Sequence, residues 1–243
     1  MPLNKLLKPI FETDLIRIGG NNDGGYLIGK KSLINTKILL SIGIANNWSF
    51  EKDFILKNKK ADLVCYDNQL NLIYLLKYIY INFIKIFNFN FKNFFSSIRN
   101  VFDFLFFFKK YYTKKFILGE DFNKIIKKFK TNEIFLKIDI EGNEYRILNE
   151  IIKFQNKLSG LIIEFHNIDI HMIQIINFIR RFKLKLIHIH PNNYSEVSYD
   201  KNPLTIEITF EKNPIKINDF KSLPHPLDQK NDPTKNDIKI KFK

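Results

Sequence analysis

Residues 134–145, IFLKIDIEGNEY, join an apolar run of strand length to a glycine turn that precedes a helix-length segment. Lys137, Asp139 and Glu141 occupy alternate positions in this stretch, so a strand would place them on one face. Burial of such charges is costly unless they serve a ligand, a metal or an ion pair. The stretch predicts a buried strand that ends in functional groups. An ion pair of Lys137 with Asp139 or Glu141 is the alternative that involves no ligand.

Similar apolar runs lie on both sides of this stretch, and helix-length segments separate them. Near-continuous apolar runs indicate strands that are covered on both faces, as in parallel sheets. Their alternation with helices predicts an α/β fold with right-handed crossovers. The other runs are residues 38–44, 62–66, 161–165 and 184–189, and the helical segments are residues 48–59, 141–157 and 168–182.

The last strand-like segment differs from the others because no helix precedes it. Residues 204–210 alternate strongly and follow residues 184–189 after a loop alone. Consecutive strands joined in this way pair antiparallel, which predicts an antiparallel strand at the edge of a mostly parallel sheet. Residues 213–243 are rich in Pro, Asn, Asp and Lys and are expected to form an extended tail on the surface.

The N-terminal region contains two glycine pairs. Residues 19–25, GGNNDGG, precede an apolar run, which predicts a tight hairpin turn before a strand. We expect residues 1–35 to form an N-terminal hairpin or lid. The whole chain, residues 1–243, is expected to form one domain.

Residues 71–110 are crowded with Phe, Tyr, Ile and Leu, but Lys and Asn interrupt them. No window reaches the roughly 18 uninterrupted apolar residues of a membrane span. The segment is expected to be a helical insertion, and helices packed on the sheet are the default because aromatic stripes at helical spacing usually face a core. An oligomer or membrane-surface patch and a substrate lid are the alternatives. Residues 102–108, FDFLFFF, would form a large patch in need of a partner if they were exposed.

The composition limits the class of protein. The 243 residues are 45% hydrophobic and 26% charged, which excludes a disordered or fibrous chain. One cysteine excludes a disulfide framework and a thiolate zinc site and favours a reducing, cytoplasmic location. The net charge of +14 could indicate nucleic acid, an anionic membrane surface or an acidic substrate. Because the lysines are scattered along the chain, a bias of composition explains the charge better.

Ligands of open α/β sheets bind beyond the carboxyl ends of the strands, so the residues there are candidates for a site. Residues 41–47, SIGIANN, form a turn with one glycine that leads into a helix, where the backbone can approach a carboxylate or phosphate. The next strand ends at Asp67, and a carboxylate at this place commonly accepts hydrogen bonds from ribose hydroxyls. A solvated Asp67 in a loop is the alternative.

Acidic and imidazole side chains gather at the ends of later strands. Glu164 and His166 share a face in LIIEFH, and His188 and His190 share a face in LIHIHPNNY. Together with Asp139, these groups come from three consecutive strand ends. Such convergence predicts general acid and base chemistry, a hard metal ion, or both.

These segments, taken in order, resemble FkbM-like methyltransferases. Residues 136–145 resemble the family's signature, which is a lysine, an apolar residue, Asp, an apolar residue, Glu-Gly and a second Glu. The resemblance covers most of the chain from Arg17 to the tail, except residues 71–110. It implies a class I, Rossmann-like fold that uses S-adenosylmethionine (SAM) to methylate a hydroxyl group of a carbohydrate or small metabolite. The sequence departs from the glycine-rich cofactor turn of such enzymes, because Gly43 stands there alone.

The resemblance also implies roles for particular residues. Ser41, Gly43 and Asn46 would contact the amino acid end of the cofactor. Asp67 would hold its ribose. The site would be closed from the N-terminal side by Gly24, Gly25 and Tyr26.

For the chemistry, we expect His166 or His190 to be the base, because imidazole titrates near neutrality, and Asp139 and Glu141 to assist. Asp139, Glu164 and His166 could hold Mg²⁺ or a similar ion, which would lower the pKa of the acceptor.

Two other functions compete with this one. The first is a nucleic-acid-binding methyltransferase, and the second is a non-catalytic Rossmann-like protein that docks on a membrane or partner. The expected partner is a small-molecule or glycan acceptor rather than nucleic acid. Peripheral membrane contact and an oligomer formed through residues 71–110 remain open.

Overall fold

The computed structural model describes residues 3–84, 91–199, 202–216 and 223–243. Its centre is a seven-stranded sheet with the strand order β6-β5-β4-β7-β8-β10-β9. All neighbouring strands are parallel except β10, which is antiparallel to both β8 and β9. In sheet order the strands are β6 (Tyr112–Lys114), β5 (Asp62–Asp67), β4 (Ile38–Ile42), β7 (Ile134–Ile138), β8 (Leu158–Phe165), β10 (Ile206–Glu211) and β9 (Lys185–Pro191).

The predicted fold class, a Rossmann-like and mostly parallel α/β sheet, is confirmed. The six predicted strands are present, and the last two pair antiparallel as expected. One detail differs, because β10 lies between β8 and β9 and the outermost strand is therefore β9. The short strand β6 was not predicted. Helix α5 (Gly119–Lys128) was missed although Phe122, Ile125 and Ile126 have helical spacing and are buried.

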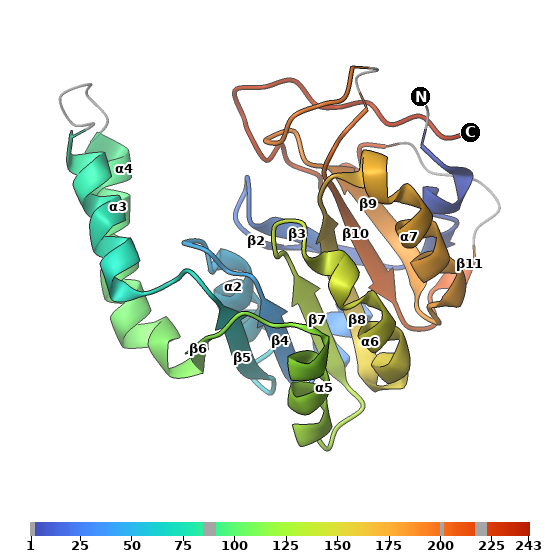
Figure 1. The fold of residues 1–243 in the computed structure, drawn as a ribbon, viewed down its shortest axis with the longest axis horizontal. Helices are drawn as coiled ribbons and strands as arrows, with labels where there is room; N and C mark the ends of the chain where they lie inside the picture. The colour runs from blue at the N-terminus through green and yellow to red at the C-terminus, as the bar shows by residue number, and fades with distance from the viewer. Residues whose placement is uncertain (1–2, 85–90, 200–201, 217–222) are drawn as a thin grey trace.

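Each face of the sheet is covered by a different set of elements (Figure 1). Helices α5, α6 (Leu148–Phe154) and α7 (Ile168–Arg181) pack on one face. Helices α1 (Lys30–Asn35) and α2 (Ser49–Lys57) and the hairpin of β2 (Leu15–Gly19) with β3 (Gly25–Gly29) pack on the other. Neighbouring strand residues alternate between the two cores, as Leu39 and Leu40 do. The hairpin of β2 and β3 lies on the face of the sheet that carries Lys137 and Glu164.

Within residues 71–110, helices α3 (Leu72–Ile84) and α4 (Phe91–Asp103) form an arm that projects away from the sheet (Figure 1). Leu75, Phe104 and Phe108 are buried at its base and join the core. Many other apolar side chains of the arm are exposed, so the default expectation of helices packed on the sheet holds only at the base. Part of the predicted insertion, residues 85–90, lies outside the described residues. Among the described residues, no helix is long and apolar enough to cross a bilayer.

The two ends of the chain lie together (Figure 1). Strand β1 (Phe11–Glu12) pairs with β11 (Ile215–Lys216), and Leu3 forms a parallel bridge with Phe242. The tail crosses strands β9 and β10, where Asn231 donates a 2.7 Å hydrogen bond to Glu207. The described part of residues 213–243 therefore runs over the surface of the body.

Candidate functional site

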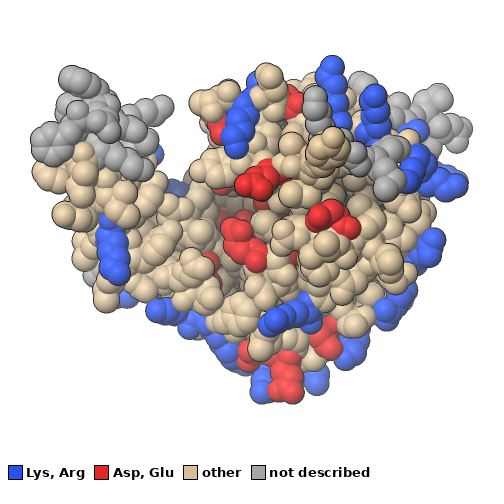
Figure 2. All heavy atoms as spheres, turned by 45° about the horizontal axis from the view of Figure 1, so that its top comes forward, with Lys and Arg blue, Asp and Glu red and all other residues tan. Residues whose placement is uncertain are grey.

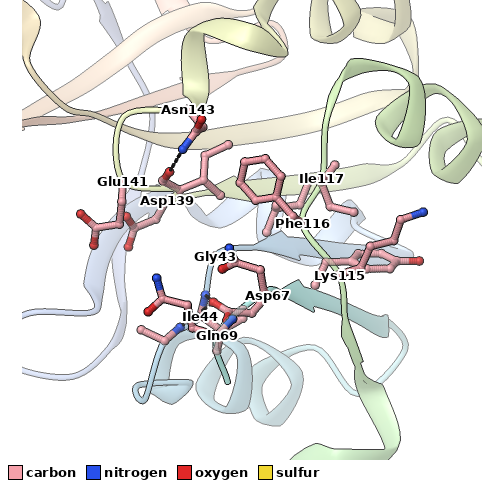
Figure 3. Close-up of a pocket in the computed structure, with 15 residues that line it drawn as sticks. Gly43, Ile44, Asp67, Gln69, Lys115, Phe116, Ile117, Asp139, Glu141 and Asn143 are labelled. Atoms are coloured by element: carbon pink, nitrogen blue, oxygen red, sulfur yellow. Dashed lines mark hydrogen bonds between the residues drawn. The ribbon is translucent and has the colours of Figure 1, made fainter. Parts of the chain in front are cut away.

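The main candidate site is a pocket of about 260 Å³ at the carboxyl ends of β4, β5 and β7. The chain leaves β4 toward β5 on one side and later returns to β7 on the other side, so this is the switch point where open α/β sheets bind ligands. Figure 3 shows Asp139 and Glu141 at one end of the pocket and Lys115 and Phe116 at the other. The remaining lining residues are Ile42, Gly43, Ile44, Ala45, Tyr66, Asp67, Asn68, Gln69, Ile117, Ile140 and Asn143.

Gly43 joins the loops that follow β4 and β7. Its φ of +83° is a backbone conformation that L side chains rarely adopt. A Cβ atom at this position would lie 2.5 Å from the carbonyl carbon of Asp139 and closer still to its oxygen. The Gly43 N–H donates to Tyr66, and its carbonyl accepts a 2.7 Å hydrogen bond from Lys137 Nζ. Gly43 lines the pocket as expected, and the close approach of the two loops is what requires a glycine there.

Asp67 stands at the expected place but is already fully engaged. One carboxylate oxygen accepts hydrogen bonds from the N–H groups of Ile44 and Ala45, and the other accepts from Gln69 and Leu70. Burial opposes the charge of this carboxylate, yet the backbone bonds prevail and lower its pKa. Asp67 therefore fixes the loops after β4 and β5, and the alternative of a solvated side chain is wrong.

Asp139, Glu164 and His166 meet beside the pocket, and one ligand atom from each lies within 4.8 Å of the others. The Tyr26 hydroxyl from the N-terminal hairpin reaches both carboxylates, at 3.5 Å from Asp139 and 3.4 Å from Glu164. Asn192 donates a 2.8 Å hydrogen bond to Glu164. The convergence expected from strand ends is thus real for these groups, and only Asp139 among the three clustered groups lines the pocket itself.

Burial determines the electrostatics of this cluster. It raises the pKa of Asp139 to about 6, although Lys137 and His166 act in the opposite direction. Burial, together with the charges of Asp139 and Glu207, also raises the pKa of Glu164 well above its usual value. Two neighbouring carboxylates with raised pKa values bind protons or cations readily near neutrality. Such a pair is typical of functional sites.

Glu144, the second Glu of the sequence signature, positions His166. Its Oε1 lies 3.0 Å from His166 Nδ1 and accepts hydrogen bonds from the N–H groups of Ile140 and Gly142. His166 Nε2 then faces Glu141 at 3.4 Å and Glu164 at 3.6 Å. Burial would lower the pKa of His166, but the bond to Glu144 and the neighbouring acids raise it.

Lys137 forms an ion pair, although not with the expected partners. Its ammonium lies 3.6 Å from Glu51 on α2 and both side chains are almost completely buried. Burial lowers the pKa of Lys137, but Glu51, Asp139 and Glu164 outweigh it and raise this pKa. The alternative of a pair with Asp139 or Glu141 is therefore wrong, because helix α2 supplies the acid from elsewhere in the sequence.

The same ion pair explains Ser41. Its hydroxyl donates a 2.5 Å hydrogen bond to Glu51 and is completely buried. Ser41 does not line the pocket, so it supports β4 from the side of α2.

Other predicted site residues also lie away from the pocket. His190 is on β9, which β10 separates from β8, and its Nδ1 faces Glu207 at 3.4 Å. Burial opposes the charge of His190, and the bond to Glu207 raises its pKa. Asn46, Gly24 and Gly25 do not line the pocket either. The hairpin tip that holds the two glycines packs on the start of α2, where Ser49 donates to the Gly24 carbonyl.

Backbone strain concentrates beside the pocket. Ala45, Glu141 and Asn167 have positive φ values of 50°, 53° and 51° without being glycines. They follow strands β4, β7 and β8 respectively. Residues held in this conformation cost free energy and cluster at binding sites, where the surrounding structure maintains them.

Several residues of the site escaped the sequence analysis. Glu51 gave no signal, because its role depends on the packing of α2. Glu144 was visible only as a letter of the signature, and its contact with His166 joins two different loops. Asn192 directly follows β9, and no local pattern indicates its contact with Glu164 on β8.

Solved structures of other proteins have a fold similar to that of this chain. No family model and no curated protein matches the chain, so the resemblance to FkbM-like methyltransferases has no support from them. Among solved structures, a precorrin-6y methyltransferase from Geobacter metallireducens covers 75% of this chain and 84% of its own, at 11% identity and a TM-score of 0.43. An O-methyltransferase from Bacillus cereus in complex with SAH covers 74% and 76%, at 12% identity and a TM-score of 0.37. The fibrillarin pre-rRNA processing protein of Methanococcus jannaschii covers 84% of both chains, at 8% identity and a TM-score of 0.40. Similarity of this degree does not determine the reaction, which has to be inferred from this chain's own residues.

Proposed function

We propose that this protein is a SAM-dependent methyltransferase that methylates a hydroxyl group of a small molecule such as a sugar or secondary metabolite. The observation that carries the proposal is the pocket at the switch point of the sheet, with the carboxylates of Asp139 and Glu141 in its wall. SAM combines an adenosine with a cationic sulfonium and an ammonium group, and carboxylates favour such cations.

The lining residues fit this cofactor in their chemistry. Ile44, Phe116 and Ile117 offer apolar surface for the adenine ring. Because both oxygens of Asp67 are occupied, we assign the ribose hydroxyls to the neighbouring amides of Asn68 and Gln69, which also line the pocket. This replaces the expected direct contact of Asp67 with the ribose.

Bound SAM supplies an electrophilic methyl group, so the protein has to orient the acceptor and remove its proton. We assign the proton to Asp139, because it lines the pocket and its pKa of about 6 leaves it ionised at neutral pH. His166 lies behind it and favours the carboxylate form of Asp139. His166 is thereby a positioning residue, and His190 has no part in the step.

A divalent cation in the same cluster is a second form of the proposal, in which Asp139 is a ligand of the ion and not the base. The residues fit, because Asp139, Glu164 and His166 offer ligand atoms close together and Glu144 turns His166 Nε2 toward them. Mg²⁺ or a similar ion held there would lower the pKa of an acceptor hydroxyl. The comparisons give this ion no support, and the cluster geometry is its only basis.

Nucleic acid remains the second expected substrate class, and the electrostatics of the site do not favour it. The face shown in Figure 2 is hollowed between the arm and the rest of the protein, and acidic side chains lie in the hollow. A phosphate backbone would be repelled by the carboxylates at this end of the sheet. The charge of +14 therefore does not point to a polyanion in the pocket.

Calorimetry with S-adenosylhomocysteine (SAH) tests the cofactor without knowledge of the acceptor. We expect saturable binding and a rise in the free energy of unfolding of about 2.7 kcal/mol when free SAH is a hundredfold above its Kd. Gln69→Ala should weaken the binding, whereas Gln174→Ala on the exposed side of α7 should not. A chain that neither binds SAH nor is stabilised by it would overturn the proposal. Repetition with Mg²⁺ and with EDTA tests the ion.

The base is tested with tritium-labelled SAM and a panel of sugar and phenol acceptors. Asp139→Asn should lower turnover by about 10²–10⁴-fold, the range typical of a general base, while SAH still binds saturably. His190→Gln should retain turnover. The kcat of the wild type should rise with pH through about 6, because the ionised form of Asp139 is the active one. If His190→Gln were inactive and Asp139→Asn active, the assignment would be wrong.

A further inference from the structure

The arm formed by α3 and α4 exposes apolar side chains over much of its described length. Ile73, Tyr80, Phe95 and Phe106 expose between 64% and 81% of their surface. Such side chains are far more exposed than those of an ordinary surface helix, which turns its apolar stripe toward a core. Other exposed apolar residues of the arm are Leu76, Ile81, Phe83, Ile84, Phe102 and Leu105.

The exposed residues of each helix share a face. In α3 they follow the spacing of Ile73, Leu76, Tyr80 and Phe83, which is that of one helical stripe. In the other half of the arm, the rings of Phe102 and Phe106 stack in parallel with centroids 6.3 Å apart. The stripes are therefore continuous surfaces rather than scattered residues, and surfaces of this kind mark interaction sites.

Polar groups inside the arm are turned inward. Asn82 of α3 and Ser97 of α4 are almost completely buried, and the Asn82 amide donates a 2.8 Å hydrogen bond to the Ser97 hydroxyl. The Asn82 amide also donates to the carbonyl of Tyr78. An apolar outside around a satisfied polar pair suits a nonpolar environment, in which polar groups have to find partners within the protein.

The charge of the arm is cationic. No Asp or Glu occurs between Asn68 and Phe102, whereas Lys77, Lys85, Lys92 and Arg99 do. The single acid of the next residues, Asp103, binds Lys52 and Trp48 of the body. On the face shown in Figure 2, the described residues of the arm are mostly uncharged, with basic and no acidic side chains among them.

We propose that the α3–α4 arm docks on an anionic lipid membrane, with its apolar stripes among the acyl chains and its cations at the headgroups. Each helix has 13 residues and is thus about 20 Å long, too short for a hydrocarbon core of about 30 Å. The arm therefore lies in the interface. Lys77 and Arg99 stand among its exposed apolar residues, and their long side chains reach the headgroups from there. Burial of apolar area and attraction of the basic side chains to anionic headgroups both contribute to membrane binding. This inference does not depend on the proposed function.

Lipid is favoured over other occupants by the kind of residues exposed. A second copy of the chain would bring its own arm cations against these cations. RNA requires aromatic rings combined with a basic groove, whereas Ile and Leu contribute much of this surface. An anionic bilayer matches both the aliphatic side chains and the charge.

Vesicle cosedimentation of the full chain tests the proposal with two compositions, pure phosphatidylcholine and phosphatidylcholine mixed with phosphatidylglycerol. We expect binding to the mixed vesicles, weaker binding at high salt, and little binding to pure phosphatidylcholine. Phe102→Ser with Phe106→Ser should weaken the binding on the order of a hundredfold, since two large apolar side chains leave the lipid. The matched control is Ile170→Ser with Ile173→Ser, which changes two residues of α7 that are 75% and 77% exposed and should bind as the wild type does.

Charge reversal provides a second variant that leaves the apolar residues in place. Lys77→Glu with Arg99→Glu should weaken binding by about 25-fold or more at low salt, because each basic residue near the surface contributes about fivefold. Lys185→Glu with Lys212→Glu, both exposed and outside the arm, is the control. The proposal is overturned if the wild type does not bind anionic vesicles, or if arm and control variants bind alike. Two other results would also overturn the proposal, provided that the wild type does not bind vesicles. The first is a dimer in light scattering that the arm variants do not form, and the second is an RNA complex in filter binding that the arm variants do not form.

Discussion

Replacement of Gly43 by alanine tests the geometry of the whole pocket. The methyl group would have to enter a loop whose φ is +83° and would overlap the carbonyl group of Asp139. The left-handed backbone costs about 1–2 kcal/mol for a residue with a Cβ atom, and overpacking costs typically about 1–3 kcal/mol. We therefore expect Gly43→Ala to lower the free energy of unfolding by about 2–5 kcal/mol. It should also weaken SAH binding, because the loops after β4 and β7 have to separate.

Urea denaturation followed by circular dichroism measures this loss. The matched control is Gly119→Ala at the first turn of α5, where a Cβ atom would meet Glu150 at an ordinary contact distance of 3.4 Å. Alanine is the better helix former, so the control should leave the stability unchanged or raise it by up to about 1 kcal/mol. If Gly43→Ala were as stable as this control, the close approach of the two loops would be refuted.

Three further substitutions test the buried polar groups. Glu144→Gln removes the carboxylate that raises the pKa of His166, so this pKa should fall, as an NMR titration of the imidazole will measure. The raised pKa of His166 stabilises the fold below the unfolded value of about 6.5, and this contribution is lost as the pH rises. The variant should therefore lose more stability at pH 5.5, about one unit below that value, than in alkaline buffer. Asp67→Asn leaves backbone N–H groups without acceptors and should cost about 1–3 kcal/mol. The lowered pKa of Asp67 stabilises the fold above about pH 4 and this is lost as the pH falls, so unfolding curves of the two proteins should converge in acid. Lys137→Met leaves the buried Glu51 charge without a partner and should lower the free energy of unfolding by about 3–5 kcal/mol. The double variant with Glu51→Gln should regain part of this free energy, as urea denaturation will measure.

The strand ends were predictable because their signal is local. Apolar runs identified β7 and β8, and the period of two put Glu164 and His166 on one face of their strand. Because the carboxyl ends of parallel strands lie at the same edge of a sheet, Asp139 was expected near them. The neighbourhood of these three groups follows from the order of the parallel strands, and the structure confirms it. The same reasoning failed for His190, because a strand that returns antiparallel was inserted between β8 and β9.

The partners of the buried polar groups depend on contacts that no local pattern contains. Lys137 finds Glu51 because α2 packs across β4 and β7, and Tyr26 reaches the cluster because the N-terminal hairpin folds over that face. Asp67 lies where the sequence places it, yet its hydrogen bonds leave its oxygens occupied.

By itself, the sequence determined the alternation of strands and helices, the glycine turn and the chemical types of the residues at the strand ends, because hydrophobic periodicity and turn chemistry act within a few residues. Only the tertiary structure decided which of those side chains meet, which are occupied by internal bonds, and that helices α3 and α4 project as an arm with exposed apolar side chains. The reason is physical: burial, pairing and pKa depend on groups far apart in the chain that packing brings within a few ångströms.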